Sequence, residues 1–336
     1  MGLKEDLENI KIPDDPNTSA HLWGITVITK LFWTVGVCNL RSFWGAASLS
    51  LGIFGNWTIL GHHGCHGGLE GVNRMTYARG ASRWTRWLDW WDAKGWSYEH
   101  NHLHHYFLSE EKDPDLVERN LEWLRESRAP DCLKIVLVFL MASSWKWIYY
   151  APNINENSGI KYFPQKEYIA FYYVIVPFIY HLNGYDWAIC WMFLAEIMTN
   201  LHSFLVIVPN HAGDDLYRFD TECEIYSDEY YRRQIVSSAN FSYGNDIVDY
   251  LHGWLNYQIE HHIFPDKGLL WYRKAVPHVQ QICLKHGLKY TKENVFIRLK
   301  KTVDIMIGRT SMLRCRKNTH GELPRETDLK VGSIDT

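Results

Sequence analysis

Three short segments of this sequence are rich in histidine and share one spacing. In each of them two nitrogen-bearing side chains are four residues apart, so they lie one turn apart on the same face of a helix. One such pair arises easily by chance, but three pairs indicate a common purpose. The segments are HHGCH (62–66), HNHLHH (100–105) and QIEHH (258–262).

The side chains that share these faces predict a metal centre. A buried imidazole needs a partner for both ring nitrogens, and burial of a charged imidazole is costly. Neutral imidazole is a good ligand for iron, zinc, copper and nickel. One zinc ion takes about four ligands, so eight or nine candidates predict two metal ions. The candidates, which include one histidine directly beyond an apolar segment, are His62, His66, His100, His104, His105, His211, Gln258, His261 and His262.

Three further histidines lie near these positions without sharing their faces. His63 and His102 alternate with the candidate ligands, so they are expected to point elsewhere and to have supporting or surface roles. His202 precedes His211 by nine residues, which places it on the opposite face of a continuous helix. It is not expected to bind the same metal ions.

Four apolar segments come close to the ~17–25 residues that a helix needs to cross a bilayer. Short links join them in pairs, which predicts two helical hairpins. A fifth apolar stretch, inside residues 133–150, is too short to cross and is expected to lie on the membrane surface as an amphipathic helix. The four predicted spans are residues 21–40, 43–60, 168–184 and 187–208.

The distribution of basic residues predicts which side of the membrane carries the histidines. Two hairpins place residues 61–167 and all residues from 209 onward on one side. That side holds many arginines and lysines, whereas Arg41 is the single basic residue in the hairpin tips. Because basic loops stay in the cytosol, the histidine segments are expected to face it. The paired segments and this charge asymmetry argue against a large soluble helical protein.

The expected fold is an all-α membrane protein with two transmembrane helical hairpins (four spans) and a cytosolic helical cap that carries a dimetal site. Residues 21–307 form its domain, between a polar N-terminal tail (1–20) and a polar tail (308–336) that is expected to be disordered. The N-terminus lacks the basic and apolar regions of a signal peptide. A net charge of −3 and the lack of basic runs predict no nucleic-acid partner.

The order and spacing of the three segments resemble the histidine boxes of the membrane fatty acid desaturase family, which read HxxxH, HxxHH or HxxxHH, and HxxHH or QxxHH. The resemblance extends from about residue 40 to 290. DPDL (113–116) and PHVQQICLKHGLKY (277–290) are similar to segments that flank the boxes. The glutamine of the third box is typical of the front-end branch, which inserts a double bond between an existing one and the carboxyl end.

This resemblance implies a di-iron centre that uses O2 to desaturate a fatty acyl chain, carried as a CoA ester or in a membrane lipid. Its iron ligands would be His62, His66, His100, His104, His105, His211, His261 and His262, with Gln258 in the place of a ninth histidine. Many front-end members carry a fused cytochrome b5 domain with an HPGG motif, which this sequence lacks. Electrons are therefore expected from a separate cytochrome b5 or ferredoxin. The endoplasmic reticulum is the first expected location, with plastid and bacterial membranes as alternatives.

Two alternative functions follow from the same residues. A hydroxylase of the same superfamily would return oxygen to the carbon atom. A membrane receptor or transporter with a zinc site would need three or four ligands rather than eight. An acyl substrate also implies an extended apolar tunnel. The tryptophans near the histidine segments could line it, or could instead pack in the core or anchor the protein at the membrane interface: Trp90, Trp91, Trp96 and Trp254.

Overall fold

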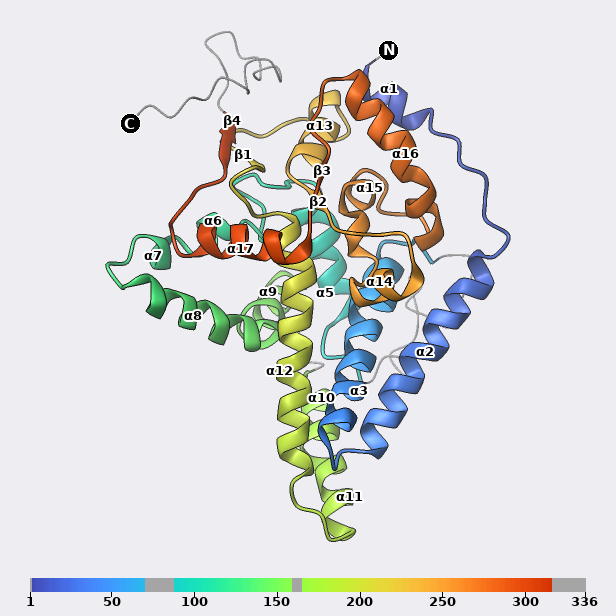
Figure 1. The fold of residues 1–336 in the computed structure, drawn as a ribbon, viewed down its shortest axis with the longest axis vertical. Coiled ribbons are helices and arrows are strands. Elements are labelled where there is room, and N and C mark those ends of the chain that lie inside the picture. Colours follow the sequence, from blue (N-terminus) through green and yellow to red (C-terminus); the bar gives the residue numbers. More distant parts are fainter. Residues whose placement is uncertain (1, 70–87, 159–164, 316–336) are drawn as a thin grey trace.

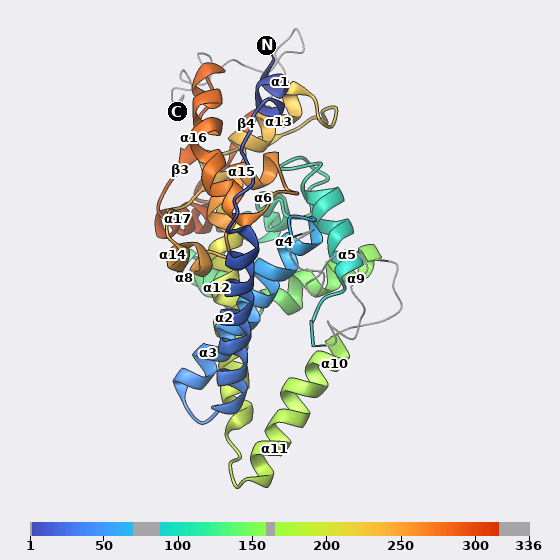
Figure 2. The ribbon, with the colours of Figure 1, turned by 90° about the vertical axis from the view of Figure 1, so that its right-hand side faces the viewer.

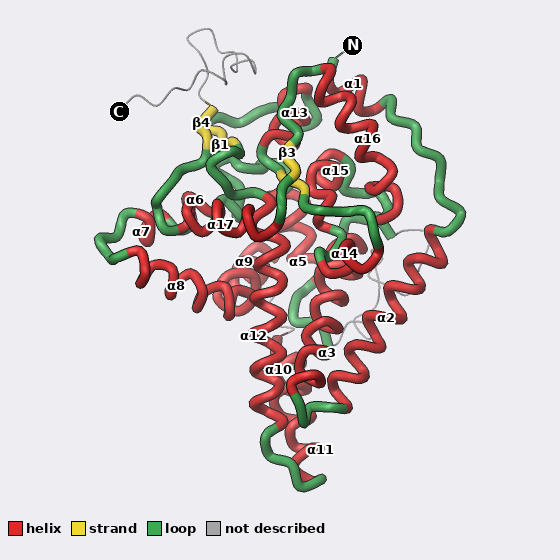
Figure 3. Tube along the Cα trace, in the orientation of Figure 1, coloured by secondary structure: helices red, strands yellow, loops and turns green. Residues whose placement is uncertain are grey.

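The computed structural model describes residues 2–69, 88–158 and 165–315. Long helices form a narrow stem at one end of the molecule, and shorter helices form a broad cap at the other (Figure 1). The view turned by 90° shows the same division, with α2, α3, α11 and α12 extending away from the cap (Figure 2). Figure 3 shows how strongly helix predominates over strand.

The helices and strands have the following bounds. The helices are α1 (Leu3–Glu8), α2 (Thr18–Cys38), α3 (Phe43–Phe54), α4 (His62–Cys65), α5 (Ala93–Ser97), α6 (Val117–Asn120), α7 (Glu122–Arg125), α8 (Asp131–Ser143), α9 (Ala151–Ser158), α10 (Gln165–Ala170), α11 (Val176–Leu182), α12 (Ala188–Ile207), α13 (Asp228–Val236), α14 (Asp246–Leu251), α15 (Gln258–Ile263), α16 (Leu269–Lys285) and α17 (Val295–Met306). The wider π-helical segments are Gly55–Gly61, Tyr98–His104, Lys146–Tyr150 and Phe171–Ile175. The strands are β1 (Tyr217–Phe219), β2 (Ala239–Asn240), β3 (Thr291–Lys292) and β4 (Leu313–Cys315).

The first helical hairpin consists of α2 and α3, which pack closely because glycines face the partner helix. A Cβ atom on Gly36 would lie 2.3 Å from the backbone nitrogen of Leu49, and one on Gly52 would lie 2.5 Å from the backbone of Trp33. Small residues allow such close approach between apolar helices. The backbone continues from α3 through a π-helical segment into α4 without a break, and so carries His62 to the top of the stem.

The second hairpin joins the run from α10 to α11 to the long helix α12. This run is helical from residue 165 to 182 without interruption. α12 also packs against α3 and α8. Its Thr199 hydroxyl lies 3.1 Å from the hydroxyl of Ser50, so the two hairpins form one stem.

Two helices of the described chain are long and apolar enough to cross a membrane, namely Thr18–Cys38 and Ala188–Asn210. A third candidate is a bent pair, Asp131–Ser143 with Lys146–Glu156, whose halves differ in direction by 75°. The stem helices expose many large apolar side chains, as shown by Leu31 (57%) and Phe178 (57%). Such exposure is unusual for a surface that faces water.

The stretch predicted as one surface helix over 133–150 is in fact two helical segments. α8 ends at Ser143, where the hydroxyls of Ser143 and Ser144 both donate to the carbonyl of Leu140. At the start of the second segment, the backbone N–H of Lys146 donates to the Asn200 side chain of α12 at 2.8 Å. These competing bonds end the first segment and start the second in a new direction.

The cap contains helices together with four short strands, which the all-α prediction did not include. β1 pairs with β4, and β2 pairs with β3, both in parallel. β4 lies within the segment from 308 that was expected to be disordered, so residues 313–315 belong to the fold; residues 316–336 lie outside the described chain. The predicted N-terminal tail likewise contains α1, whose Leu3 and Leu7 are buried against α13 and α16.

Candidate metal centre

A wide helical turn brings the three candidate ligands of the second segment onto one face. The N–H of His105 donates to the carbonyl of His100, five residues earlier, at 3.0 Å. This π-helical pairing gives more residues per turn than an α-helix, and it is frequent at functional sites. His100, His104 and His105 are all buried, and the rings of His100 and His104 stack with centroids 5.1 Å apart.

Seven of the nine predicted ligands form two groups suited to one metal ion each. The first group combines the first two histidine segments with one histidine of α15, and the second combines the second segment with α15 and the end of α12. Within each group the ligand atoms lie within 4.8 Å of one another. The groups are His62, His66, His100 and His261, and His104, His211 and His262.

In each group two ring nitrogens point at a common centre. The Nε2 atoms of His62 and His261 are 3.0 Å apart, and those of His211 and His262 are 3.1 Å apart. When two nitrogens bind the same metal ion at ~2.1 Å each, and the N–metal–N angle is roughly a right angle, the nitrogens are about 3 Å apart. The arrangement of these four rings therefore fits metal binding.

The remaining two predicted ligands lie beside these groups. The ring of His105 stacks on that of His262 at 4.2 Å and lies 4.5 Å from that of His66. Gln258 is buried, with its Nε2 atom 2.8 Å from Nε2 of His211. Its Oε1 atom accepts a hydrogen bond from Asn210 at 3.0 Å. Both side chains thus lie beside the two groups. We call the nine predicted ligands together the histidine cluster.

Several of these buried nitrogens have no hydrogen-bond partner among the described residues. They include Nε2 of His66 and both ring nitrogens of His100 and His105. A buried polar atom without a partner lowers the stability of the folded state. The unpaired nitrogens therefore indicate that a ligand binds here. Two metal ions held by these histidines would satisfy the unpaired nitrogens.

The opposite ring nitrogens of four histidines are held by the surrounding protein. Each Nδ1 atom lies within hydrogen-bonding distance of an oxygen, which turns Nε2 toward the cluster and fixes the ring. The partners of Nδ1 are the Asp113 carboxylate for His104 (2.9 Å), the Ser237 carbonyl for His211 (3.2 Å), the Tyr272 hydroxyl for His261 (3.3 Å) and the Gln234 side chain for His262 (2.9 Å).

Sequence reasoning missed these supporting residues, although the DPDL segment contained a signal. Asp113 is fixed by the backbone N–H groups of Ser109 and Asp115. Asp115 accepts hydrogen bonds from Tyr149 and lies 3.6 Å from His104. Glu99 is also buried nearby, and burial together with the charges of Asp115 and Asp113 raises its pKa well above the ordinary value.

Burial keeps most of the cluster neutral. It is the largest cause, ahead of the neighbouring imidazoles, that lowers the pKa values of seven histidines well below the ordinary value: His62, His66, His100, His105, His211, His261 and His262. Burial also opposes charge on His104, but Asp113 and Asp115 together outweigh it and raise the pKa of His104. Neutral imidazole is the form that binds metal ions.

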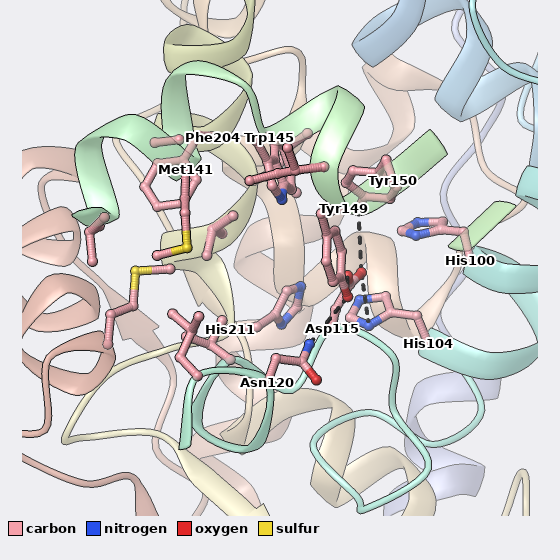
Figure 4. Close-up of a pocket in the computed structure, with 18 of the residues that line it drawn as sticks. His100, His104, Asp115, Asn120, Met141, Trp145, Tyr149, Tyr150, Phe204 and His211 are labelled. Carbon is pink, nitrogen blue, oxygen red and sulfur yellow. Dashed lines mark hydrogen bonds and ion pairs between the residues drawn. The ribbon is translucent and has the colours of Figure 1, made fainter. Parts of the chain in front are cut away.

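A cavity of about 200 Å³ opens beside the cluster. His100, His104 and His211 lie at one end of it, and Met141, Trp145 and Phe204 form apolar walls (Figure 4). These walls come from α8, the segment after it and α12. We refer to this space as the apolar cavity.

The four tryptophans that were candidates for a tunnel do not belong to the described lining of the apolar cavity. Among the described lining residues of the apolar cavity, Trp145 is present, and Trp90, Trp91, Trp96 and Trp254 are not. Trp96 instead stacks on the ring of His100 at 4.3 Å, and Trp254 packs against Tyr257. All four belong to the hydrophobic core, which fits the alternative role of core packing; aromatic content alone does not show which face a side chain occupies.

The three histidines set apart from the ligands lie outside both groups. His63 is buried with its Nε2 atom 3.3 Å from the carbonyl of Gly253, and His102 is exposed. His202 stacks on Phe54 at 3.8 Å. These contacts agree with supporting and surface roles for His63 and His102, and with the expectation that His202 lies apart from the candidate ligands.

Three known desaturases are similar to this chain. The acyl-lipid (9-3)-desaturase of Physcomitrium patens is 28% identical over 221 residues, which are 59% of this chain and 40% of that protein. Delta(5) fatty acid desaturase A of Dictyostelium discoideum is 23% identical over 234 residues, 58% of this chain and 48% of that protein. The sn-1 linoleoyl-lipid 6-desaturase of Arthrospira platensis is 22% identical over 323 residues, 87% of this chain and 85% of that protein.

The chain spans less than half the length of the first two of these relatives. The sequence model of the fatty acid desaturase family matches residues 41–294. This range contains all three histidine segments, both histidine groups and the described walls of the apolar cavity except Met306. The chain belongs to the fatty acid desaturase family.

Proposed function

We propose that this protein desaturates a fatty acyl chain, carried as a CoA ester or in a membrane lipid, with O2 and two electrons from a separate carrier. Two hydrogens leave adjacent carbons of the chain; with these, the two electrons and two protons from the solvent, O2 is reduced to two molecules of water. The observation that carries the proposal is that two groups of buried histidines border one apolar cavity. The family relationship supports the same reading.

The histidine groups fit two iron ions, with His105 and Gln258 as further candidate ligands beside them. Bound iron would supply the activated oxygen needed to break unactivated C–H bonds. The protein holds the rings in position through Nδ1 contacts such as that of His104 with Asp113. These contacts hold Nδ1 on the protein side of the ring and so orient Nε2 for metal binding.

The apolar cavity would orient the substrate. Its walls of Met141, Trp145 and Phe204 suit methylene groups and exclude water. His62 and His100 border the same space, so an acyl chain within it would lie beside the cluster. Positioning of this kind supplies much of the rate enhancement of a reaction between bound groups.

We further propose that both hairpins cross the membrane, giving four spans. The helical runs 43–61 and 165–182 each contain a π-helical segment, but they are continuous and lie beside the two longer candidates. Their exposed side chains include Phe43, Val174 and Ile179. The apolar face of α8 would then rest in the membrane surface. The membrane is proposed to be the endoplasmic reticulum, with the cap in the cytosol, where cytochrome b5 or ferredoxin would dock.

Expression in a host of known fatty acid composition tests the function. New double bonds, located by mass spectrometry, are the expected result, and a hydroxylated product would support a hydroxylase instead. His261→Ala should abolish the product while the protein still accumulates in membranes. The matched control is His278→Ala, an exposed histidine of α16, which should leave product formation unchanged.

Elemental analysis of the purified protein provides an independent test. About two iron ions per chain are expected from the two histidine groups. About one zinc ion per chain, with no iron, would refute the di-iron proposal and favour a receptor or transporter. Loss of iron in His261→Ala but not in His278→Ala would link the metal to the cluster.

A further inference from the structure

A second cavity reaches the histidine cluster from another direction. It has a volume of about 790 Å³, and its described lining includes His66 and His105. The apolar cavity instead borders His62 and His104. No histidine of the cluster lines both spaces among the described residues. The cluster therefore separates two cavities.

The second cavity differs from the first in the chemistry of its walls. Its walls include apolar side chains such as Phe264, but Glu8, Asp14, Asn101 and His102 add polar and charged groups. Glu8, Asp14 and His102 are exposed, so they lie toward its mouth. Polar and charged walls suit water and hydrated ions and are unfavourable for an acyl chain. We call this space the polar cavity.

One wall of the polar cavity is the connection between α1 and α2, residues 9–17, which we call the N-terminal strap. It runs along the outside of the cap (Figure 1). The strap is fixed near its two ends: Asp6 contacts Lys285 at 2.6 Å, and Asp15 contacts Lys274 at 2.9 Å. Both lysines belong to α16, so the strap is tied to one helix at two points.

We propose that metal ions pass between the aqueous phase and the histidine cluster through the polar cavity, beneath the N-terminal strap. The inference rests on the proposed metal centre. An ion that leaves water needs oxygen and nitrogen ligands along its way. The carboxylates of Glu8 and Asp14 and the imidazole of His102 offer them near the mouth, and His66 lies at the inner end.

The apolar cavity is a poor route for the same ion. Passage along Met141, Trp145 and Phe204 would strip water from a divalent cation without replacing it, which is strongly unfavourable. An acyl chain bound there would also block it. Separate routes allow the metal centre to be loaded while the substrate space remains dry.

The test measures how fast a chelator removes iron from the loaded protein in detergent, followed by the absorbance of the ferrozine complex. Lys274→Gln frees one end of the strap and should accelerate removal up to about fivefold, the factor that a partly exposed ion pair contributes to an equilibrium. The matched control is Lys300→Gln, which removes the ion pair with Asp304 on α17 and should leave the rate unchanged. His102→Trp narrows the mouth and should slow removal at least twofold.

The outcomes separate the route from the metal centre itself. Faster removal in Lys274→Gln and slower removal in His102→Trp would support the polar cavity. Iron removal at the wild-type rate in both variants would overturn the route. If excess oleate slows iron removal and neither variant changes it, the route lies through the apolar cavity instead. Protein that binds no metal would overturn both this inference and the proposed function, whereas metal-loaded protein with unaltered rates would overturn the route only.

Discussion

Glu196→Gln is predicted to destabilise the protein more than Lys146→Met, although the two residues form one ion pair. Their Nζ and Oε1 atoms are 2.5 Å apart, and the side chains are 0% and 8% exposed. The pair joins the segment after α8 to α12. Removal of one partner of a buried ion pair typically costs about 3–5 kcal/mol, because the other charge is left without compensation.

The partners that remain in each variant decide the order. In Lys146→Met, the Glu196 carboxylate still accepts hydrogen bonds from Trp147, Tyr168 and Asn200, all at 2.9–3.0 Å. In Glu196→Gln, the ammonium keeps the Tyr168 hydroxyl at 3.2 Å and the faces of nearby aromatic rings. We therefore expect about 2–3 kcal/mol for Lys146→Met and about 3–5 kcal/mol for Glu196→Gln.

Thermal unfolding in detergent measures both changes. A loss of 3 kcal/mol in a protein of this size corresponds to a fall of the midpoint by roughly 4 °C. The double variant Lys146→Met, Glu196→Gln should lose less than the sum of the single losses, because neither charge is left buried alone. Equal losses in the two single variants, or strict additivity in the double variant, would refute this account of the network.

Three further predictions follow from other contacts. Asp113→Asn weakens the anchor of His104 and should lower metal affinity or turnover about 10–100-fold, as measured by iron retention during dialysis; unchanged retention contradicts the anchoring role. Ala142→Phe fills the apolar cavity and should reduce product formation with the iron content unchanged, whereas parallel loss of iron would indicate misfolding. Burial opposes ionisation of Asp215, but Arg298 and Lys301 hold the pKa at about 2, so its stabilisation is complete above pH ~4 and is lost as the pH falls toward 2. Asp215→Asn should therefore lose about 1–2 kcal/mol at pH 7 and make thermal stability less dependent on pH between 4 and 2; an unchanged acid transition would contradict this role.

The convergence of the candidate ligands was the most predictable part of the molecule. Spacings such as that of His62 and His66 follow from helix geometry, so the sequence alone indicates shared faces. The structure brings seven of the nine candidates into two groups. The predicted stem segments also coincide with helices, because long apolar runs such as 187–208 have few alternatives to helix.

Features that depend on contacts between distant segments were not predictable. The π-helical turn before His105 and the break after Ser143 need neighbours that the sequence does not identify, such as Asn200 at the break. The same holds for Trp145, which lines the apolar cavity while the four predicted tryptophans do not. β4 was missed because three residues carry little periodic signal, and its pairing partner lies almost a hundred residues earlier.

Helix α8 has two faces with different neighbours. Val138 and Ala142 border the apolar cavity, while Val136 and Leu140 on the outer face are 52% and 54% exposed. In the proposed membrane arrangement, a wall one helix thick would separate the proposed reaction space from the surrounding lipid. Lateral pressure from tightly packed lipids would press on this wall. We therefore expect the fluidity of the membrane to affect how readily an acyl chain enters the apolar cavity. In this way the fluidity would adjust the degree of saturation of the lipids in that same membrane.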